Sequence, residues 1–83
     1  STPERKDVVE LINAGVLSVP KTEDGKYTNI ASINIKDAVT KEEIAELTAK
    51  AKVDAAKFAN VKTKGEFYRL LFRRSSFRSF FRN

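Results

Sequence analysis

The chain has 83 residues, enough for one small domain, and its hydrophobic content of 41% is near that of ordinary globular proteins. It contains no cysteine and no histidine, which excludes disulfides and thiolate zinc sites and removes the commonest general base. We therefore expect a non-enzymatic protein without a cofactor or metal. No apolar run reaches the roughly 18–20 residues of a membrane span, and the start is polar, so we expect a cytoplasmic protein or a component of an assembly.

The charge is unevenly distributed along the chain. Residues 1–62 carry ten Lys/Arg and ten Asp/Glu, whereas residues 63–83 carry six and one, which is the whole net charge of +5. Most of the aromatic residues also lie in this last segment. Its basic residues are mainly arginine, which suits bidentate contact with phosphate or carboxylate and stacking on aromatic rings.

The N-terminal residues predict a short helix. Pro3 suits the first turn of a helix, and Val8, Leu11 and Ile12 share one apolar face. Gly15 predicts the end of this helix, because glycine readily adopts the left-handed conformation found there.

The next segment predicts a β-hairpin, and with it an α+β fold. Residues 16–19 are a short apolar run that ends at Pro20. Asp24-Gly25 is the strongest turn signal in the chain. Residues 28–35 are rich in β-branched side chains and form the expected second strand.

A long helix follows, from Lys41 to about Phe58. Thr40 and Glu43 have the spacing of a capping box, in which each side chain bonds the other's backbone. Residues at spacings of three and four form its core-facing stripe: Ile44, Leu47, Ala51, Ala55 and Phe58.

The acidic residues of this helix are candidates for catalysis only by residue type. We place all three on the solvent face, where they balance charge beside Lys50: Glu42, Glu43 and Glu46. This interpretation favours a binding protein over an enzyme.

A third helix is predicted from about Lys64. Thr63 and Glu66 repeat the capping-box spacing, and an apolar majority follows. Beyond Arg74 the apolar residues move roughly 130° around an ideal helix, so one straight helix would not bury both sets. The helix therefore ends near Ser75, or its last turn faces another body.

This break defines the expected organisation. Residues 1–74 form a compact α+β domain, and residues 75–83 form a basic aromatic tail. The predicted core consists of apolar residues from every element: Val8, Leu11, Ile12, Val16, Ile33, Ile35, Ile44, Leu47, Ala51, Phe58, Leu70 and Leu71.

The C-terminal segment is the predicted binding site because it interleaves arginine with phenylalanine. Our first hypothesis is a nucleic-acid-binding accessory protein, in which basic residues contact phosphates of DNA or RNA and aromatic rings stack on bases. The site residues are Lys64, Arg69, Arg73, Arg74, Phe77, Arg78, Phe80, Phe81 and Arg82.

Other interpretations of the same residues stay open. The alternative hypothesis is a structural or inhibitory subunit whose Phe/Arg tail docks on an acidic protein surface, since arginine and aromatic residues concentrate at interface hot spots. A membrane surface is less favoured, because the apolar arc is not sustained along one face. The phenylalanines could also simply complete this protein's own core.

Overall fold

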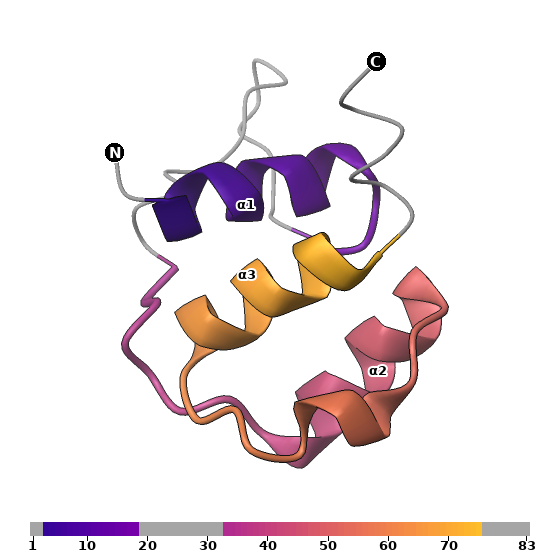
Figure 1. The fold of residues 1–83 in the computed structure, drawn as a ribbon. Coiled ribbons are helices and arrows are strands. Elements are labelled where there is room, and N and C mark those ends of the chain that lie inside the picture. The colour runs from indigo at the N-terminus through magenta and orange to yellow at the C-terminus, as the bar shows by residue number, and fades with distance from the viewer. Residues whose placement is uncertain (1–2, 19–32, 76–83) are drawn as a thin grey trace.

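The computed structural model describes residues 3–18 and 33–75, and within them the regular structure is helical (Figure 1). Helix α3 lies between α1 and α2 and contacts both. The elements, in chain order, are α1 (Pro3–Asn13), α2 (Lys41–Ala51), the short 3₁₀ helix η2 (Ala55–Phe58) and α3 (Lys64–Arg74).

The α+β expectation is wrong, because these two ranges contain three α-helices and no strand. Their one β-type contact is an isolated antiparallel bridge between Ala38 and Thr63. Residues 19–32, which hold the expected hairpin turn, lie outside the described part of the chain.

The expected first strand fails because its backbone completes the end of α1. The Val16 N–H donates to the Leu11 carbonyl at 3.0 Å, and the Gly15 N–H donates to Ile12 at 3.0 Å. Gly15 has a φ of +80°, so this is a Schellman motif with glycine in the left-handed position. The motif turns Val16 back into the core, where it is buried.

The end of the expected second strand is a turn stabilised by Asn34. Its side-chain oxygen accepts from the Lys36 N–H at 3.0 Å, and its carbonyl accepts from the Asp37 N–H at 3.1 Å. Asparagine commonly forms such turns, which compete with strand pairing. In residues 33–35, the described part of the expected strand, the turn preference of Asn34 therefore outweighed the β-branched composition.

Helix α2 ends seven residues before the predicted boundary. Lys52 adopts the left-handed conformation, with φ 60° and ψ 42°. Its N–H donates to the Ala49 carbonyl at 3.2 Å, and the Val53 N–H donates to the Thr48 carbonyl at 3.0 Å. Together these bonds form a second Schellman motif. The sequence signal was weak, because lysine stands where glycine is usual.

A separate helical turn, η2, restarts the chain after this reversal. The Asp54 side chain accepts from the Ala56 N–H at 3.0 Å and caps it. Phe58 is fully buried, whereas Ala55 is exposed. The reversal therefore separates two residues that a single helix would have placed on one stripe.

The helix α3 prediction is confirmed. The Thr63 hydroxyl accepts from the Glu66 N–H at 3.2 Å, and Glu66 accepts from the Lys62 N–H at 2.8 Å. At the other end, the Ser75 N–H donates to the Leu71 carbonyl at 3.0 Å, and the Ser75 hydroxyl donates to the Phe72 carbonyl at 2.8 Å. The Thr63 cap is the one that the sequence predicted, whereas Glu66 bonds the Lys62 N–H and not that of Thr63, and the Ser75 cap was not predicted.

The core lies where α1, α2, η2 and α3 meet. Phe58 of η2 and Phe67 of α3 contact edge to face, with ring centroids 5.3 Å apart. Most of the predicted core is buried, whereas Ile33, Ile44 and Leu70 pack at its margin and Ile35 is half-buried outside it. The buried hydrophobic residues are Val8, Leu11, Ile12, Val16, Leu47, Ala51, Phe58, Phe67, Tyr68 and Leu71.

The left-handed Lys52 yields the first prediction. An L-residue in this conformation costs about 1–2 kcal/mol, and glycine avoids this cost but loses about 0.5–1 kcal/mol of entropy. We expect Lys52→Gly to raise the free energy of unfolding by up to about 1 kcal/mol in urea titrations. Ala59→Gly is the control. Ala59 has right-handed helical angles, so glycine at this position should lower the free energy of unfolding. A loss of stability in Lys52→Gly would contradict the left-handed assignment.

Candidate nucleic-acid interface

The four described site residues lie along α3 and not at one point. Lys64 is in the first turn, Arg69 is in the middle, and Arg73 and Arg74 are in the last turn. The helix rises about 1.5 Å per residue, so the two ends of this series are about 15 Å apart. The remaining predicted site residues lie outside the described part of the chain: Phe77, Arg78, Phe80, Phe81 and Arg82.

Lys64 belongs to the junction between α2 and α3. Its ammonium lies 3.5 Å from the Glu43 carboxylate, and both side chains are largely covered. The solvent-face placement of Glu43 is therefore wrong, whereas Glu42 and Glu46 are exposed as expected. Glu43 is not free to complete the capping box, because its carboxylate is turned onto α3.

Tyr68 provides the second contact of Glu43. Its hydroxyl donates to the carboxylate at 2.8 Å, and the tyrosine is buried. Burial raises the pKa of Tyr68 far above its ordinary value, and the hydrogen bond and negative charge of Glu43 raise the pKa further. One carboxylate thus holds two residues of α3 and sets how α3 lies against α2.

The last turn of α3 forms a cationic site with η2. Arg73 and Arg74 are exposed and line a hollow of about 400 Å³ together with Lys57 and Asp54, and Val53 forms its apolar part. We call it the η2–α3 hollow. It brings three cations and one carboxylate together from two separate elements.

Lys57 is a member of this site that sequence reasoning missed. A continuous helix to Phe58 gives no reason to associate it with the last turn of α3. The signal that could have located it is Val53-Asp54, in which an aspartate follows a β-branched residue and caps a new turn. The helix break is therefore what places Lys57 beside the arginines.

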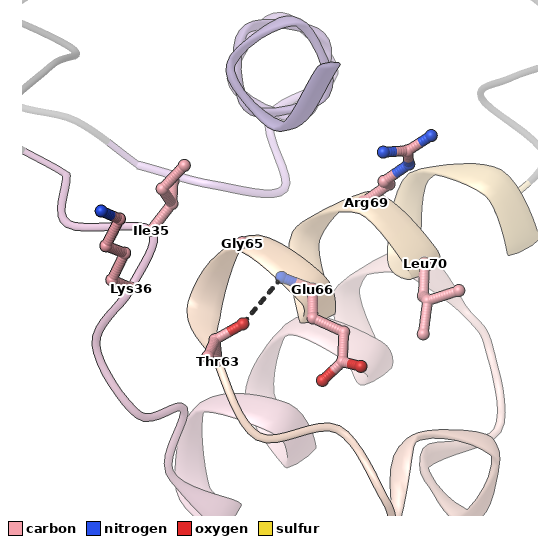
Figure 2. A pocket seen from close by; sticks show the side chains of 7 residues that line it. All are labelled: Ile35, Lys36, Thr63, Gly65, Glu66, Arg69 and Leu70. Atoms are coloured by element: carbon pink, nitrogen blue, oxygen red, sulfur yellow. Dashed lines mark hydrogen bonds between the residues drawn. The ribbon is translucent and has the colours of Figure 1, made fainter. Parts of the chain in front are cut away.

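Arg69 lines a second hollow of about 450 Å³ beside the N-terminal half of α3 (Figure 2). We call it the Gly65 hollow. Its lining is formed by residues of α3, by the helix cap and by the turn that precedes α2: Gly65, Glu66, Arg69, Leu70, Thr63, Ile35 and Lys36. The Gly65 N–H donates to the Ile35 carbonyl at 2.9 Å and attaches that turn to the helix.

Ser75 separates the described site from the tail. It is buried, and its hydroxyl and N–H both bond carbonyls of the last turn. These bonds satisfy carbonyls that would otherwise face the solvent beside the arginines. Ser75 therefore acts as a cap of α3 and offers no free hydroxyl at this surface.

No protein-family model, curated protein or solved structure matches the chain. Within residues 3–18 and 33–75, no helix has the length and apolarity to cross a membrane. The same residues contain no group of three or more acidic side chains placed to hold a metal ion. Function is therefore inferred from the site itself.

The raised pKa of Tyr68 yields a pH prediction. Unfolded tyrosine ionises near pH 10, and the folded protein keeps the proton to higher pH, so the free energy of unfolding falls as the pH rises above about 10. Tyr68→Phe removes this contribution and, at neutral pH, costs about 1–2 kcal/mol through the lost hydrogen bond.

The test is urea unfolding by circular dichroism between pH 7 and pH 11. The stability difference between the native protein and Tyr68→Phe should shrink above pH 10, by up to about 1.4 kcal/mol per pH unit. The remaining ionisable groups are common to both proteins, so their contributions cancel in the difference. Parallel pH profiles would show that Tyr68 does not retain its proton.

Proposed function

We propose that this protein is a small non-enzymatic accessory protein that binds nucleic acid through the C-terminal end of α3 and the residues that follow it. The observation that carries the proposal is the η2–α3 hollow, where Lys57, Arg73 and Arg74 are gathered and exposed. The aromatic and basic residues of the tail begin immediately after this site.

The clustering of cations favours an anionic ligand. Within the described ranges, Arg73, Arg74 and Lys57 make no ion pair, and Asp54 is the one acidic residue in the lining of this hollow. The negative end of the α3 dipole accounts for the two arginines, since it stabilises each by about 0.3–1 kcal/mol. It does not account for Lys57, which comes from another element and adds repulsion to the free protein.

The chemistry of the segment favours nucleic acid among anionic ligands. Guanidinium groups contact phosphates bidentately, and successive bases stack on aromatic rings whatever their sequence. Phe77, Phe80 and Phe81 supply such rings within a few residues of Arg73 and Arg74. A purely ionic site for a small anion would make no use of the phenylalanines.

Salt dependence is the main test. Each phosphate neutralised on a single strand contributes about 0.7 to the slope of log affinity against log salt. We expect steep salt dependence in fluorescence anisotropy with a labelled oligothymidylate, and a slope reduced by roughly 1.4 in Arg73→Gln/Arg74→Gln. A slope near zero for the native protein would refute the proposal.

The matched control removes two charges at the opposite end of α3. Lys41 and Lys62 are exposed, and the Val39 N–H bonds the Lys62 carbonyl at 2.9 Å, which keeps the two segments together near Thr63. Lys41→Gln/Lys62→Gln has the same net charge as the arginine variant. Equal losses of affinity in the two variants would show that net charge, and not this site, determines binding.

The phenylalanines give a separate prediction. Because stacking is not ionic, Phe77→Ala/Phe80→Ala/Phe81→Ala should weaken binding by about 1–3 kcal/mol per stacked base while leaving the salt slope unchanged. The same anisotropy titration measures both quantities. Unchanged affinity in the triple variant would remove the stacking role.

The acidic-protein-surface alternative predicts a different response to Arg73→Lys/Arg74→Lys. Phosphate contact that depends on charge alone tolerates lysine, whereas bidentate pairing with carboxylates does not. Retained oligonucleotide affinity in this variant would favour the nucleic-acid proposal.

A further inference from the structure

The open cations of α3 are concentrated at one end of the helix. Lys64 pairs with Glu43 at 3.5 Å, and Arg69 is already engaged in an interaction of its own. Arg73 and Arg74 are exposed and make no ion pair with another described residue. A groove that follows the backbone of a strand distributes its cations along the path of the phosphates. The cations of α3 therefore favour a single phosphate position, in the η2–α3 hollow.

The charges in this hollow match a phosphate group that carries two negative charges. Three cations and one carboxylate give the lining a net charge of +2: Lys57, Arg73, Arg74 and Asp54. A phosphodiester inside a strand has a single charge and two unesterified oxygens. A phosphomonoester at the end of a strand has three such oxygens and a charge of about −1.5 to −2 at pH 7. It thus has one oxygen for each of the three cations, whereas an internal phosphate leaves part of the positive charge uncompensated.

Asp54 places a fixed negative charge in the lining of the hollow. One oxygen of its carboxylate accepts from the Ala56 N–H at 3.0 Å, so the group is held as the cap of η2. A strand that continued past the hollow in both directions would bring a second phosphate toward this carboxylate, and the two would repel each other. A strand that ends in the hollow can leave it on the side away from Asp54. The capping carboxylate therefore favours the end of a strand over its middle.

The last turn of α3 accommodates an anion despite the direction of the helix dipole. The C-terminal end of a helix carries roughly half a negative charge on its last carbonyls. Two of these carbonyls are already satisfied, because Ser75 donates to Leu71 at 3.0 Å through its N–H and to Phe72 at 2.8 Å through its hydroxyl. The charge of the three cationic side chains outweighs what remains.

We infer that the η2–α3 hollow binds the terminal phosphomonoester of a nucleic-acid strand, and the inference rests on the proposed function. Lys57, Arg73 and Arg74 contact its three unesterified oxygens. The volume of about 400 Å³ lies within the range of roughly 300–1,000 Å³ typical of small-molecule pockets, and half-buried Val53 offers apolar surface to the terminal sugar. The bases that follow are then available for the stacking described above.

The experiment compares oligothymidylates of one length that carry a 5′-phosphate, a 3′-phosphate or hydroxyls at both ends. In competition anisotropy with the full chain at pH 7.5, we expect one phosphorylated strand to bind about tenfold more tightly than the hydroxyl strand. This is roughly the effect of one additional charge-assisted hydrogen bond. The strand that binds more tightly identifies which end is recognised. A hydroxyl strand that is two nucleotides longer controls for total charge and should bind less tightly than the preferred phosphorylated strand.

The pH gives a second readout of the same preference. A terminal phosphate takes up a proton with a pKa of about 6 and loses its second charge, so the preference should fall between pH 7.5 and pH 5.5. The chain has no histidine, the side chain that ordinarily titrates in this range. The charged groups that face the phosphate are Lys57 and Asp54 of the η2 segment and Arg73 and Arg74 of α3. A preference that stays constant over this range would contradict recognition of the doubly charged group.

Lys57→Gln tests the cation that η2 contributes. It should lose most of the tenfold preference, while salt-dependent binding of the hydroxyl strand persists. Lys41→Gln is the matched control, because Lys41 is exposed and does not line the hollow, so it should keep the preference. Thermal unfolding checks that both variants remain folded, which we expect because Lys57 is exposed as well.

The outcomes separate this inference from the proposed function. Salt-dependent binding with equal affinity for the phosphorylated and the charge-matched strands, or an unchanged preference in Lys57→Gln, would overturn the terminal-phosphate site and leave the proposed function intact. Tighter binding of a phosphoserine peptide than of the phosphorylated strands would overturn the inference in favour of a phosphoprotein.

Thymidine monophosphate, added in an amide NMR titration, tests the hollow without a strand. Shifts at Lys57 and Arg74 with thymidine monophosphate but not with thymidine would support the phosphomonoester site, even if no oligonucleotide bound. An absence of shifts together with an absence of oligonucleotide binding would overturn both.

Discussion

The reversal of the chain at Lys52 is the constraint on which the rest of the structure depends. Without the left-handed residue, α2 would continue as one helix and carry Phe58 away from α3. With it, Asp54 starts a new turn, Phe58 meets Phe67, and the core closes between η2 and α3. The same reversal brings Lys57 to the arginines of α3. One backbone conformation therefore determines both the packing of the domain and the composition of its cationic site.

Helix α3 serves the core with one face and the solvent with the other. Phe67, Tyr68 and Leu71 are buried, while Arg73 and Arg74 are exposed. Its position against α2 is held by Glu43, which contacts both Lys64 and Tyr68. Because these contacts lie at the N-terminal half of the helix, they position it without using the charges of its last turn. Those charges are left available for a ligand.

Local signals in the sequence predicted the helix ends well where the residue type matched the geometry. Gly15 terminated α1, and Thr40 and Thr63 capped α2 and α3 as expected. The predictions failed where the composition of a stretch outweighed the turn preference of one residue, or where a residue adopted an unusual conformation. Asn34 formed a turn in a stretch of β-branched residues, and Lys52 took a conformation that usually selects glycine. Propensity describes an average over contexts, and tertiary packing decides the individual case.

The sequence by itself determined the helical character of α1 and α3, most of the buried residues and the concentration of positive charge near the C-terminus. These features follow from periodicity, capping and composition, which are local properties. The tertiary structure alone decided that Glu43 turns inward, that Lys64 pairs with Glu43 and that Lys57 joins the cationic site. These are relations between segments distant in the chain, so they depend on how α2 and η2 pack against α3. The same packing places two distinct hollows along α3, where the sequence had shown only one basic segment.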